Sequence, residues 1–407
     1  LLAQPANAAE LSADLFPSFP EMITVVVDGN FNQALAHAIE TVNQGNVVKL
    51  CLDHHSPSLL MLSALNAAQN KIHPHANLAS FVDTATGNSI QLALDIARRP
   101  ASDLSHQQQH SDLSASQQFD ELLNIINAIS SRSLPSHSLP NHYWFTEPNK
   151  ARVAALTFSD DSPKATSLIL TQATGLHEPK TLLSSERLMF VVFGCEQTEL
   201  VSQLTSLREE LKCVSDSTDS ELAIATLMHS NLSHFQSVQH NAGRGANIVI
   251  QAASIEAALQ EITAIENALP KVMGDNSHYK TPAGSCFSPK PQSKGGVAFV
   301  YPGVGTVYPG MLREFHQHFP QLFARLEREG NLKEMLQAEK TYADDAQEMS
   351  LSELAIAGVG SSYLLTQLLC DEFKVQPDFA LGYSKGEASM WASLNVWKNP
   401  HALIEMT

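Results

Sequence analysis

One stretch decides the fold: Phe379-Ala380-Leu381-Gly382-Tyr383-Ser384-Lys385-Gly386-Glu387. Its first three residues predict a short strand, and helix-forming residues follow from Ala388 to Leu394. Between them, Gly382 to Gly386 fits the pattern GxSxG, in which a sharp strand-to-helix turn lifts a serine hydroxyl clear of a sheet. A side chain at either glycine would collide with the neighbouring strand or the following helix. The stretch therefore predicts a nucleophile elbow with Ser384 at its tip.

A serine hydroxyl attacks a carbonyl only when a base takes its proton and N–H donors face the oxyanion that forms. Lys385, the residue after the serine, offers one such N–H, supported by the dipole of the following helix. A tight turn that merely uses Gly and Ser would show the same five residues. The motif alone leaves both interpretations open.

A second element favours the catalytic interpretation. The run Phe299-Val300-Tyr301-Pro302-Gly303-Val304-Gly305 begins as a strand and ends in a Pro-Gly-rich turn, and Gly310-Met311 follows shortly after. The two elements together resemble the malonyl/acyl-CoA:acyl carrier protein transacylases. In that family a strand leads into Phe-Pro-Gly-Gln-Gly-Ser-Gln, then Gly-Met, and later Gly-His-Ser-x-Gly-Glu. The separation of the two motifs also agrees with the family.

This resemblance implies a role for each matching residue. Ser384 would be the nucleophile that accepts an acyl group from a CoA thioester, and the backbone N–H groups of Val304 and Lys385 would form the oxyanion hole. The remaining motif positions would support these three: Gly303, Gly305, Gly382, Tyr383, Gly386 and Glu387. Val304 stands where the family usually has Gln, and Tyr383 replaces its His, so the substrate preference of malonyl-specific members does not carry over.

The same resemblance interprets the whole chain as α/β. Residues 1–178 are similar to a degenerate ketosynthase C-terminal region that lacks the active cysteine and the histidine motif. Residues 179–294 look like the small α+β linker module between ketosynthase and acyltransferase in polyketide synthases. Residues 295–407 resemble the N-terminal part of an α/β-hydrolase-like acyltransferase domain. The combination is most similar to the acyltransferase-bearing subunit of bacterial polyunsaturated fatty acid synthases.

Hydrophobic periodicity predicts further elements. An α/β unit is expected near the start of the chain, and two strand–helix pairs and a further helix are expected in the linker module. A Ser-, Gln- and His-rich stretch from Ala101 to Pro140 predicts exposed linker around one helix, Phe119–Ile129, and Pro282–Lys294 predicts a second connector. The predicted strands are Ile23–Val27, Val47–Leu52, Leu188–Phe193 and Asn247–Ala252, and the predicted helices are Asn32–Asn43, Thr198–Leu211, Glu221–Phe235 and Ile255–Leu269.

Composition argues against several classes of protein. The formal net charge is −17, from 42 acidic and 25 basic residues, and no basic stripe is present to bind nucleic acid. No apolar run has the length of a membrane span. The five cysteines are widely spaced without a CxxC pair, which is typical of reduced thiols in a cytoplasmic protein, and the histidines show no metal-ligand spacing.

The expected reaction needs no cofactor bound by this chain, since the CoA thioester is a substrate and phosphopantetheine belongs to the partner. The implied partners are acyl-CoA, acyl carrier protein domains and other synthase subunits. Counted from Ser384, the family's base histidine falls beyond Thr407, so the 407 residues are expected to be a fragment that is inactive alone. Two alternatives stay open: a serine thioesterase or hydrolase, and a non-catalytic scaffold or docking subunit.

Overall fold

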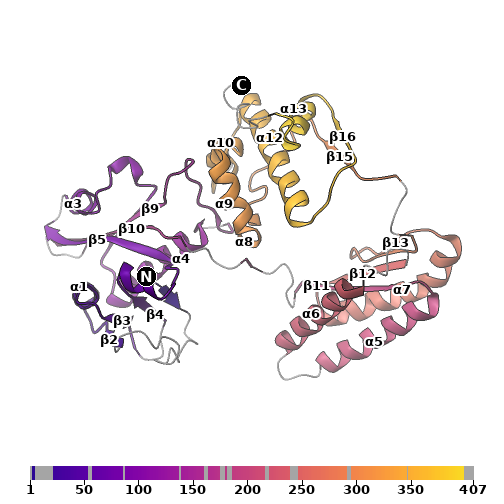
Figure 1. Cartoon of the computed structure of the whole chain (residues 1–407), viewed down its shortest axis with the longest axis horizontal. Helices are drawn as coiled ribbons and strands as arrows, with labels where there is room; N and C mark the ends of the chain where they lie inside the picture. Colours follow the sequence, from indigo (N-terminus) through magenta and orange to yellow (C-terminus); the bar gives the residue numbers. More distant parts are fainter. Residues whose placement is uncertain are drawn as a thin grey trace. The chain divides into compact units, whose positions relative to one another are not determined.

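The computed structural model describes residues 2–4, 22–53, 57–85, 88–136, 139–159, 164–174, 179–180, 186–215, 220–238, 246–290, 295–345 and 347–397. The chain divides into two units (Figure 1). The first comprises Leu1–Pro179, Phe299–Gln376 and Ala380–Thr407, and the second comprises Lys180–Ala298 with Pro377–Phe379. Strands and helices are mixed in both units, so the expected α/β class is confirmed at this level.

The first unit begins with a parallel strand pair joined by a helix. β2 (Met22–Val26) and β3 (Val47–Cys51) pair in parallel, and α1 (Phe31–Asn43) connects them. Asn30 caps α1 by accepting a hydrogen bond of 3.0 Å from the Gln33 N–H. This confirms the α/β unit predicted from the β-branched run. β4 (Ser58–Met61) and β1 (Leu2–Gln4) complete the sheet in the order β1-β4-β3-β2, and α2 (Ala64–Gln69) follows β4.

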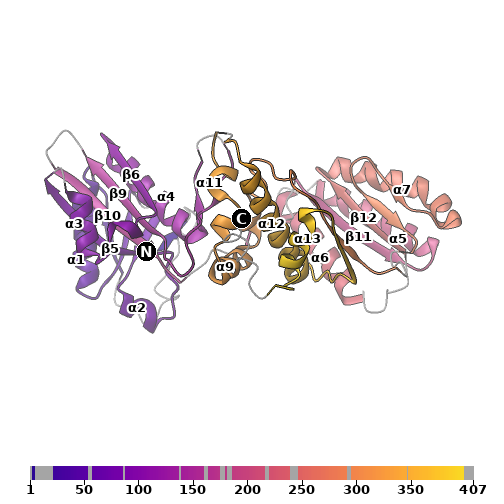
Figure 2. The same cartoon turned by 90° about the horizontal axis from the view of Figure 1, so that it is seen from above.

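A second sheet in this unit is covered by helices on both faces. Its strands are β5 (Ala76–Ala85), β10 (Lys164–Gln172), β9 (Val153–Ser159) and β6 (His106–Ser111), in that order (Figure 2). Leu156 and Leu168 pack in the core with α4 (Ala115–Ser131), whereas Val153 and Ile169 pack in a separate cluster with α3 (Ser89–Ile96). Because successive strand residues point to opposite faces, both faces of β9 and β10 are apolar.

The helix expected at Phe119–Ile129 is confirmed as part of α4, but the exposed linker expected around it, from Ala101 to Pro140, is wrong. This stretch begins with the short 3-10 turn η2 (Ala101–Asp103), continues as β6, which pairs in parallel with β9, and then forms α4, whose Phe119 is fully buried. β7 (Ser133–Leu134) pairs with β8 (His142–Tyr143) at its end. Alternate residues of β6 are exposed, so a polar edge strand has the composition of a linker although it belongs to the sheet.

The second unit packs helices on a short antiparallel sheet. β11 (Leu188–Gly194), β12 (Ala246–Ala252), β14 (Cys286–Ser288) and β13 (Tyr279–Lys280) lie in that order with α5 (Gln197–Ser215), α6 (Ser220–Val238) and α7 (Ile255–Asp275). The predicted strands and helices of this region are confirmed. The connector expected at Pro282–Lys294 is wrong in part, since β14 joins β12. The Asn231 amide binds both the N–H and the C=O of Val191 at the sheet edge, at 2.8 and 3.0 Å.

The C-terminal part of the first unit is mainly helical. It contains β15 (Ala298–Tyr301), α8 (Phe315–His318), α9 (Pro320–Glu329), α10 (Leu332–Met335), α11 (Ala338–Thr341), α12 (Leu351–Gln367), a π-helical turn at Leu368–Glu372, β16 (Phe379–Gly382) and α13 (Lys385–Ser393). Among the described residues, one helical run, Leu351–Glu372, has the length and composition of a membrane span, and 61% of its apolar window is buried in the protein.

A buried ion pair joins this helical part to the upstream sheets. Arg152 is 0% exposed and donates two hydrogen bonds, of 2.8 and 3.1 Å, to the Glu327 carboxylate. Glu327 also accepts from the Tyr143 hydroxyl at 3.1 Å and from the Thr146 N–H at 3.0 Å. Tyr143 lies in the same apolar cluster as Phe323 of α9. The segment before β9 is therefore part of the core of the C-terminal helices.

His316 lies in this junction as a neutral histidine. Its Nδ1–H donates to the Arg313 carbonyl at 3.0 Å, and its buried Nε2 has no partner among the described residues. Burial is the main cause that lowers the pKa of His316, to about 4; the hydrogen bond to the Arg313 carbonyl opposes this shift, and the nearby His142, His318 and Arg152 side chains add to it. In the unfolded chain the His316 imidazole binds a second proton near pH 6.5, whereas in the folded chain it stays neutral at that pH.

We expect His316 to make the first unit acid-sensitive. Above pH 6.5 His316 is neutral in both the folded and the unfolded chain, so it does not change the free energy of unfolding. As the pH falls from about 6.5 to 4, the folded state loses about 3 kcal/mol of stability in total. Urea titrations at several pH values, followed by tryptophan fluorescence, measure this loss. The signal reports the first unit because Trp144, Trp391 and Trp397 all belong to it. His316→Phe should flatten that window, and an unchanged pH slope would contradict the assignment.

Two glycines in α12 differ sharply in their surroundings. A Cβ added at Gly360 would lie 2.1 Å from the Met335 carbonyl oxygen, whereas one added at Gly358 would meet nothing within 4 Å. Gly360→Ala should therefore destabilise the first unit by about 1–3 kcal/mol through overpacking. Gly358→Ala should stabilise it by about 0.5–1 kcal/mol, since alanine favours a helix. Urea unfolding of both variants compares them, and equal effects would refute the close contact at Gly360.

Candidate functional site

The candidate site lies where two strands end side by side. The N–H groups of Asp378 and Phe379 donate to the Val297 carbonyl at 2.8 and 3.0 Å, and the Tyr383 N–H approaches the Tyr301 carbonyl at 3.5 Å. Both chains therefore advance in the same direction, and β15 and β16 form a two-stranded sheet. The loop after β15 and the turn after β16 meet at the same end of this sheet.

Ser384 has the strained backbone of a nucleophile elbow. Its φ is +54° and its ψ is −125°, a conformation that residues with a side chain rarely adopt. It follows β16 almost at once and directly precedes α13. The Ser384 side chain makes no capping hydrogen bond to that helix and is exposed. Such strain is found mainly at functional sites, and here it presents an uncommitted hydroxyl at a helix N-terminus.

The flanking glycines are required by close backbone contacts. A Cβ at Gly386 would lie 2.3 Å from the Tyr301 carbonyl oxygen, on the neighbouring strand. A Cβ at Gly382 would lie 2.3 Å from the carbonyl oxygen of Gly386, at the start of the following helix. These are the two collisions expected from the pattern, and they lock the turn against β15.

The Pro-Gly-rich loop lies against this turn. A Cβ built on Gly303 would be 3.7 Å from the Tyr383 carbonyl oxygen and 3.9 Å from the Ser384 Cβ, so the two motifs are neighbours in space. Within the described part of the chain, no hydrogen bond occupies the N–H of Val304 or Lys385. Gly305 has φ +100°, which turns the loop back beside the elbow.

Other motif residues face solvent. Tyr383 is 81% exposed, Val304 is 40% exposed, and Glu387 is also exposed, while Lys385 is half-buried and forms no ion pair with described residues. No described histidine hydrogen-bonds Ser384, and no group of metal-ligating side chains occurs in the part of the chain that the structure describes. Among these residues, the structure brings together the serine, the loop and two free N–H donors, without a base.

Sequence reasoning missed the support behind the site. The Tyr301 hydroxyl lies 3.0 Å from the Thr366 hydroxyl on α12, and both residues are 4% exposed. The Gln367 amide donates to the Ser393 carbonyl at 3.1 Å and ties α12 to α13. Burial raises the pKa of Tyr301, so the phenol stays protonated. The one signal in the sequence was a tyrosine directly before the Pro-Gly-rich loop, and it does not indicate which residue the tyrosine hydroxyl binds.

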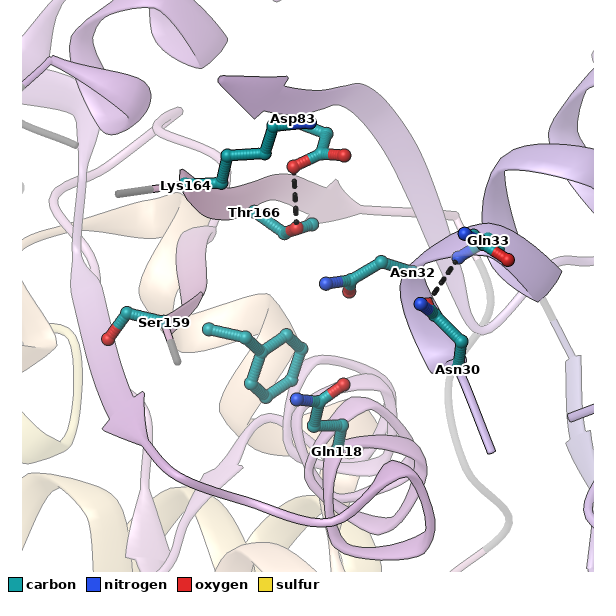
Figure 3. Close-up of a pocket in the computed structure, with 9 residues that line it drawn as sticks. Asn30, Asn32, Gln33, Asp83, Gln118, Ser159, Lys164 and Thr166 are labelled. Atoms are coloured by element: carbon teal, nitrogen blue, oxygen red, sulfur yellow. Dashed lines mark hydrogen bonds between the residues drawn. The ribbon is translucent and has the colours of Figure 1, made fainter. Parts of the chain in front are cut away.

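A separate polar cavity lies in the upstream part of the first unit (Figure 3). It has a volume of about 170 Å³ and is lined by residues of α1, α4, β5, β9 and β10: Asn30, Asn32, Gln33, Asp83, Gln118, Phe158, Ser159, Lys164 and Thr166. The Thr166 hydroxyl donates to Asp83 at 3.3 Å. The lining residues include no cysteine or histidine. They can hydrogen-bond a small polar molecule, but they offer no thiol for condensation chemistry.

Comparison with known proteins agrees with the resemblance to polyunsaturated fatty acid synthases found in the sequence. No family model matches the chain. It is 25% identical over 272 residues to a polyunsaturated fatty acid synthase subunit of Thraustochytrium sp., a match that covers 61% of this chain and 13% of the relative. The expected likeness to polyunsaturated fatty acid synthases is thereby confirmed. The chain spans only about an eighth of that relative's length.

Solved structures with partial similarity include an acyltransferase and a ketosynthase domain. The acyltransferase domain of SpnD, in complex with 2-(pent-4-yn-1-yl)malonyl, is 20% identical with a TM-score of 0.37, covering 55% of this chain and 48% of that one. The ketosynthase from module 6 of the Bacillus subtilis bacillaene synthase is 10% identical with a TM-score of 0.28, covering 59% and 58%.

Proposed function

We propose that this chain supplies the nucleophile of an acyltransferase in a polyunsaturated fatty acid or polyketide-type synthase. The observation that carries the proposal is the strained Ser384 on a strand-to-helix turn, with Gly303 of the second motif so close that a Cβ built on it would lie 3.9 Å from the Ser384 Cβ. The synthase likeness supports the same class of reaction. In this proposal the protein works in the cytoplasm with other synthase subunits.

The reaction would proceed in two steps. Ser384 Oγ attacks the carbonyl carbon of an acyl-CoA thioester, its proton passes to a base, and the C–S bond breaks to release CoA. The phosphopantetheine thiol of a carrier protein then attacks the new ester, and Ser384 leaves with its proton restored. The N–H groups of Val304 and Lys385 would stabilise the oxyanion in both steps, aided by the N-terminal dipole of α13. The chain itself needs no bound cofactor.

We propose that the general base is a histidine that is not among the described residues in contact with Ser384. A serine of this kind loses most of its reactivity without a base, because the catalytic groups act as a unit. The 407 residues alone should therefore form little acyl-enzyme. A second candidate is a scaffold subunit in which the elbow is retained without catalysis, and the exposed Ser384 hydroxyl with no histidine bonded to it among the described residues favours this candidate.

The test uses the natural polypeptide with radiolabelled acetyl-, malonyl- and palmitoyl-CoA and a separately purified acyl carrier protein. An acyltransferase should exchange label between acyl-CoA and free CoA without carrier, and should move label to the carrier when it is present. Release of free acid at a rate independent of the carrier would identify a hydrolase instead. Neither exchange nor transfer with any of the three donors would favour the scaffold.

A further inference from the structure

Tyr301 is attached to the site through both its backbone and its side chain. Its carbonyl contacts Gly386 and faces the Tyr383 N–H, so it touches the elbow on both sides of Ser384. The loop that carries Val304 begins at the next residue, Pro302. Any shift of Tyr301 along β15 therefore moves the proposed oxyanion donor relative to the nucleophile.

The side-chain hydrogen bond of Tyr301 has a defined direction. The Thr366 hydroxyl donates its single proton to the Ser362 carbonyl at 2.8 Å. It can therefore only accept from Tyr301, whose O–H lies 3.0 Å away. Both residues are buried, so no water competes for this bond. Thr366 therefore ties the Tyr301 hydroxyl to α12, and the Ser393 side chain at the end of α13 also lies near this hydroxyl.

The anchor on α12 is itself held in place. Gly360 packs directly against the Met335 backbone, and Gln367 binds the Ser393 carbonyl at the end of α13. Val359 of α12 and Ala392 of α13 also form a small buried cluster. α12 therefore connects the helix behind Ser384 to the strand that precedes the Val304 loop.

We propose that Tyr301 is a positioning residue, and that its hydrogen bond to Thr366 holds the Val304 loop in register with Ser384. The inference rests on the proposed function of Ser384. A positional error of about 1 Å at a reacting group can cost about a hundredfold in rate, although the residue responsible never touches the substrate. The pair acts on the geometry of the site, so its loss lowers kcat and leaves KM for the acyl donor unchanged.

The experiment compares Tyr301→Phe, Thr366→Val and Thr366→Ser in the natural polypeptide. Thr341→Val is the matched control, because the buried Thr341 hydroxyl also donates to a backbone carbonyl, that of Leu336 at 2.8 Å, away from the elbow. Amide hydrogen exchange of peptides covering 301–308 and 379–387 is measured together with kcat and KM. In Tyr301→Phe and Thr366→Val we expect exchange faster by about five- to tenfold and kcat lower by about 10- to 100-fold. Thr366→Ser should restore both.

Hydrogen exchange keeps the two proposals separable. Unchanged exchange and kcat in Tyr301→Phe and Thr366→Val would overturn the positioning role, as would equal changes in Thr341→Val. If the unsubstituted polypeptide carries no acyl group on Ser384, the proposed function fails. The exchange comparison then still decides whether Tyr301 holds the loop and the elbow together.

Discussion

Replacing Ser384 with alanine should abolish acylation of the carrier protein by the natural polypeptide. In the proposed function, the exposed hydroxyl at the strained tip of the elbow is the nucleophile. Without it, water or the carrier thiol must attack the thioester directly, and loss of an activated serine costs about a thousandfold or more. Steady-state transfer from acyl-CoA to a purified carrier measures the effect.

The control for this variant lies one turn further along the same helix. Ser389 is 3% exposed, and its hydroxyl donates to the Lys385 carbonyl at 3.4 Å, within α13. Ser389→Ala should keep transfer within about twofold, because a long bond of this kind contributes little. A Ser384→Ala enzyme that still transfers at the original rate would mean that the elbow is only structural.

Removing the carboxylate of Glu327 should destabilise the first unit by about 3–5 kcal/mol. The fully buried Arg152 would keep its charge but lose its ion partner, and Tyr143 would lose its acceptor. Because this loss is comparable to a large share of a domain's stability, Glu327→Ala should unfold at much lower urea concentration. Tryptophan fluorescence reports the transition.

Glu329→Ala is the matched control on the same helix. Glu329 pairs with Arg325 at 3.2 Å, but both side chains are about a third or more exposed, at 43% and 34%. Water screens such a pair, so its loss should cost at most about 1 kcal/mol. Replacing both buried partners, as Arg152→Met with Glu327→Leu, should recover part of the loss. Equal effects of Glu327→Ala and Glu329→Ala would refute a buried junction.

The elbow was predictable because it is encoded locally. Ser384 and its glycines lie within five residues, and each residue type has one geometric reason to be there. The resemblance of the second motif to the acyltransferase family also predicted that Gly303 lies near Ser384. β11, β12 and the helices of the second unit were predictable for a similar reason, since one face of each carries apolar residues at regular spacing.

Longer-range polar contacts were not predictable from the chain. Arg152 and Glu327 are 175 residues apart, and Tyr301 and Thr366 are 65 apart, with no periodic pattern linking either pair. Composition also misled the prediction for 101–140, because an edge strand rich in Gln and His looks like linker until its partner β9 is known. Such pairs depend on which elements pack together.

The most direct test of the account is to locate the covalent intermediate. The natural polypeptide is mixed with acyl-CoA, quenched in acid, digested with pepsin and mapped by mass spectrometry. We predict an acyl group attached as an oxygen ester to Ser384, and none in Ser384→Ala. An acyl group found instead on an exposed thiol such as Cys195, or no adduct under conditions that support transfer, would contradict Ser384 as the nucleophile.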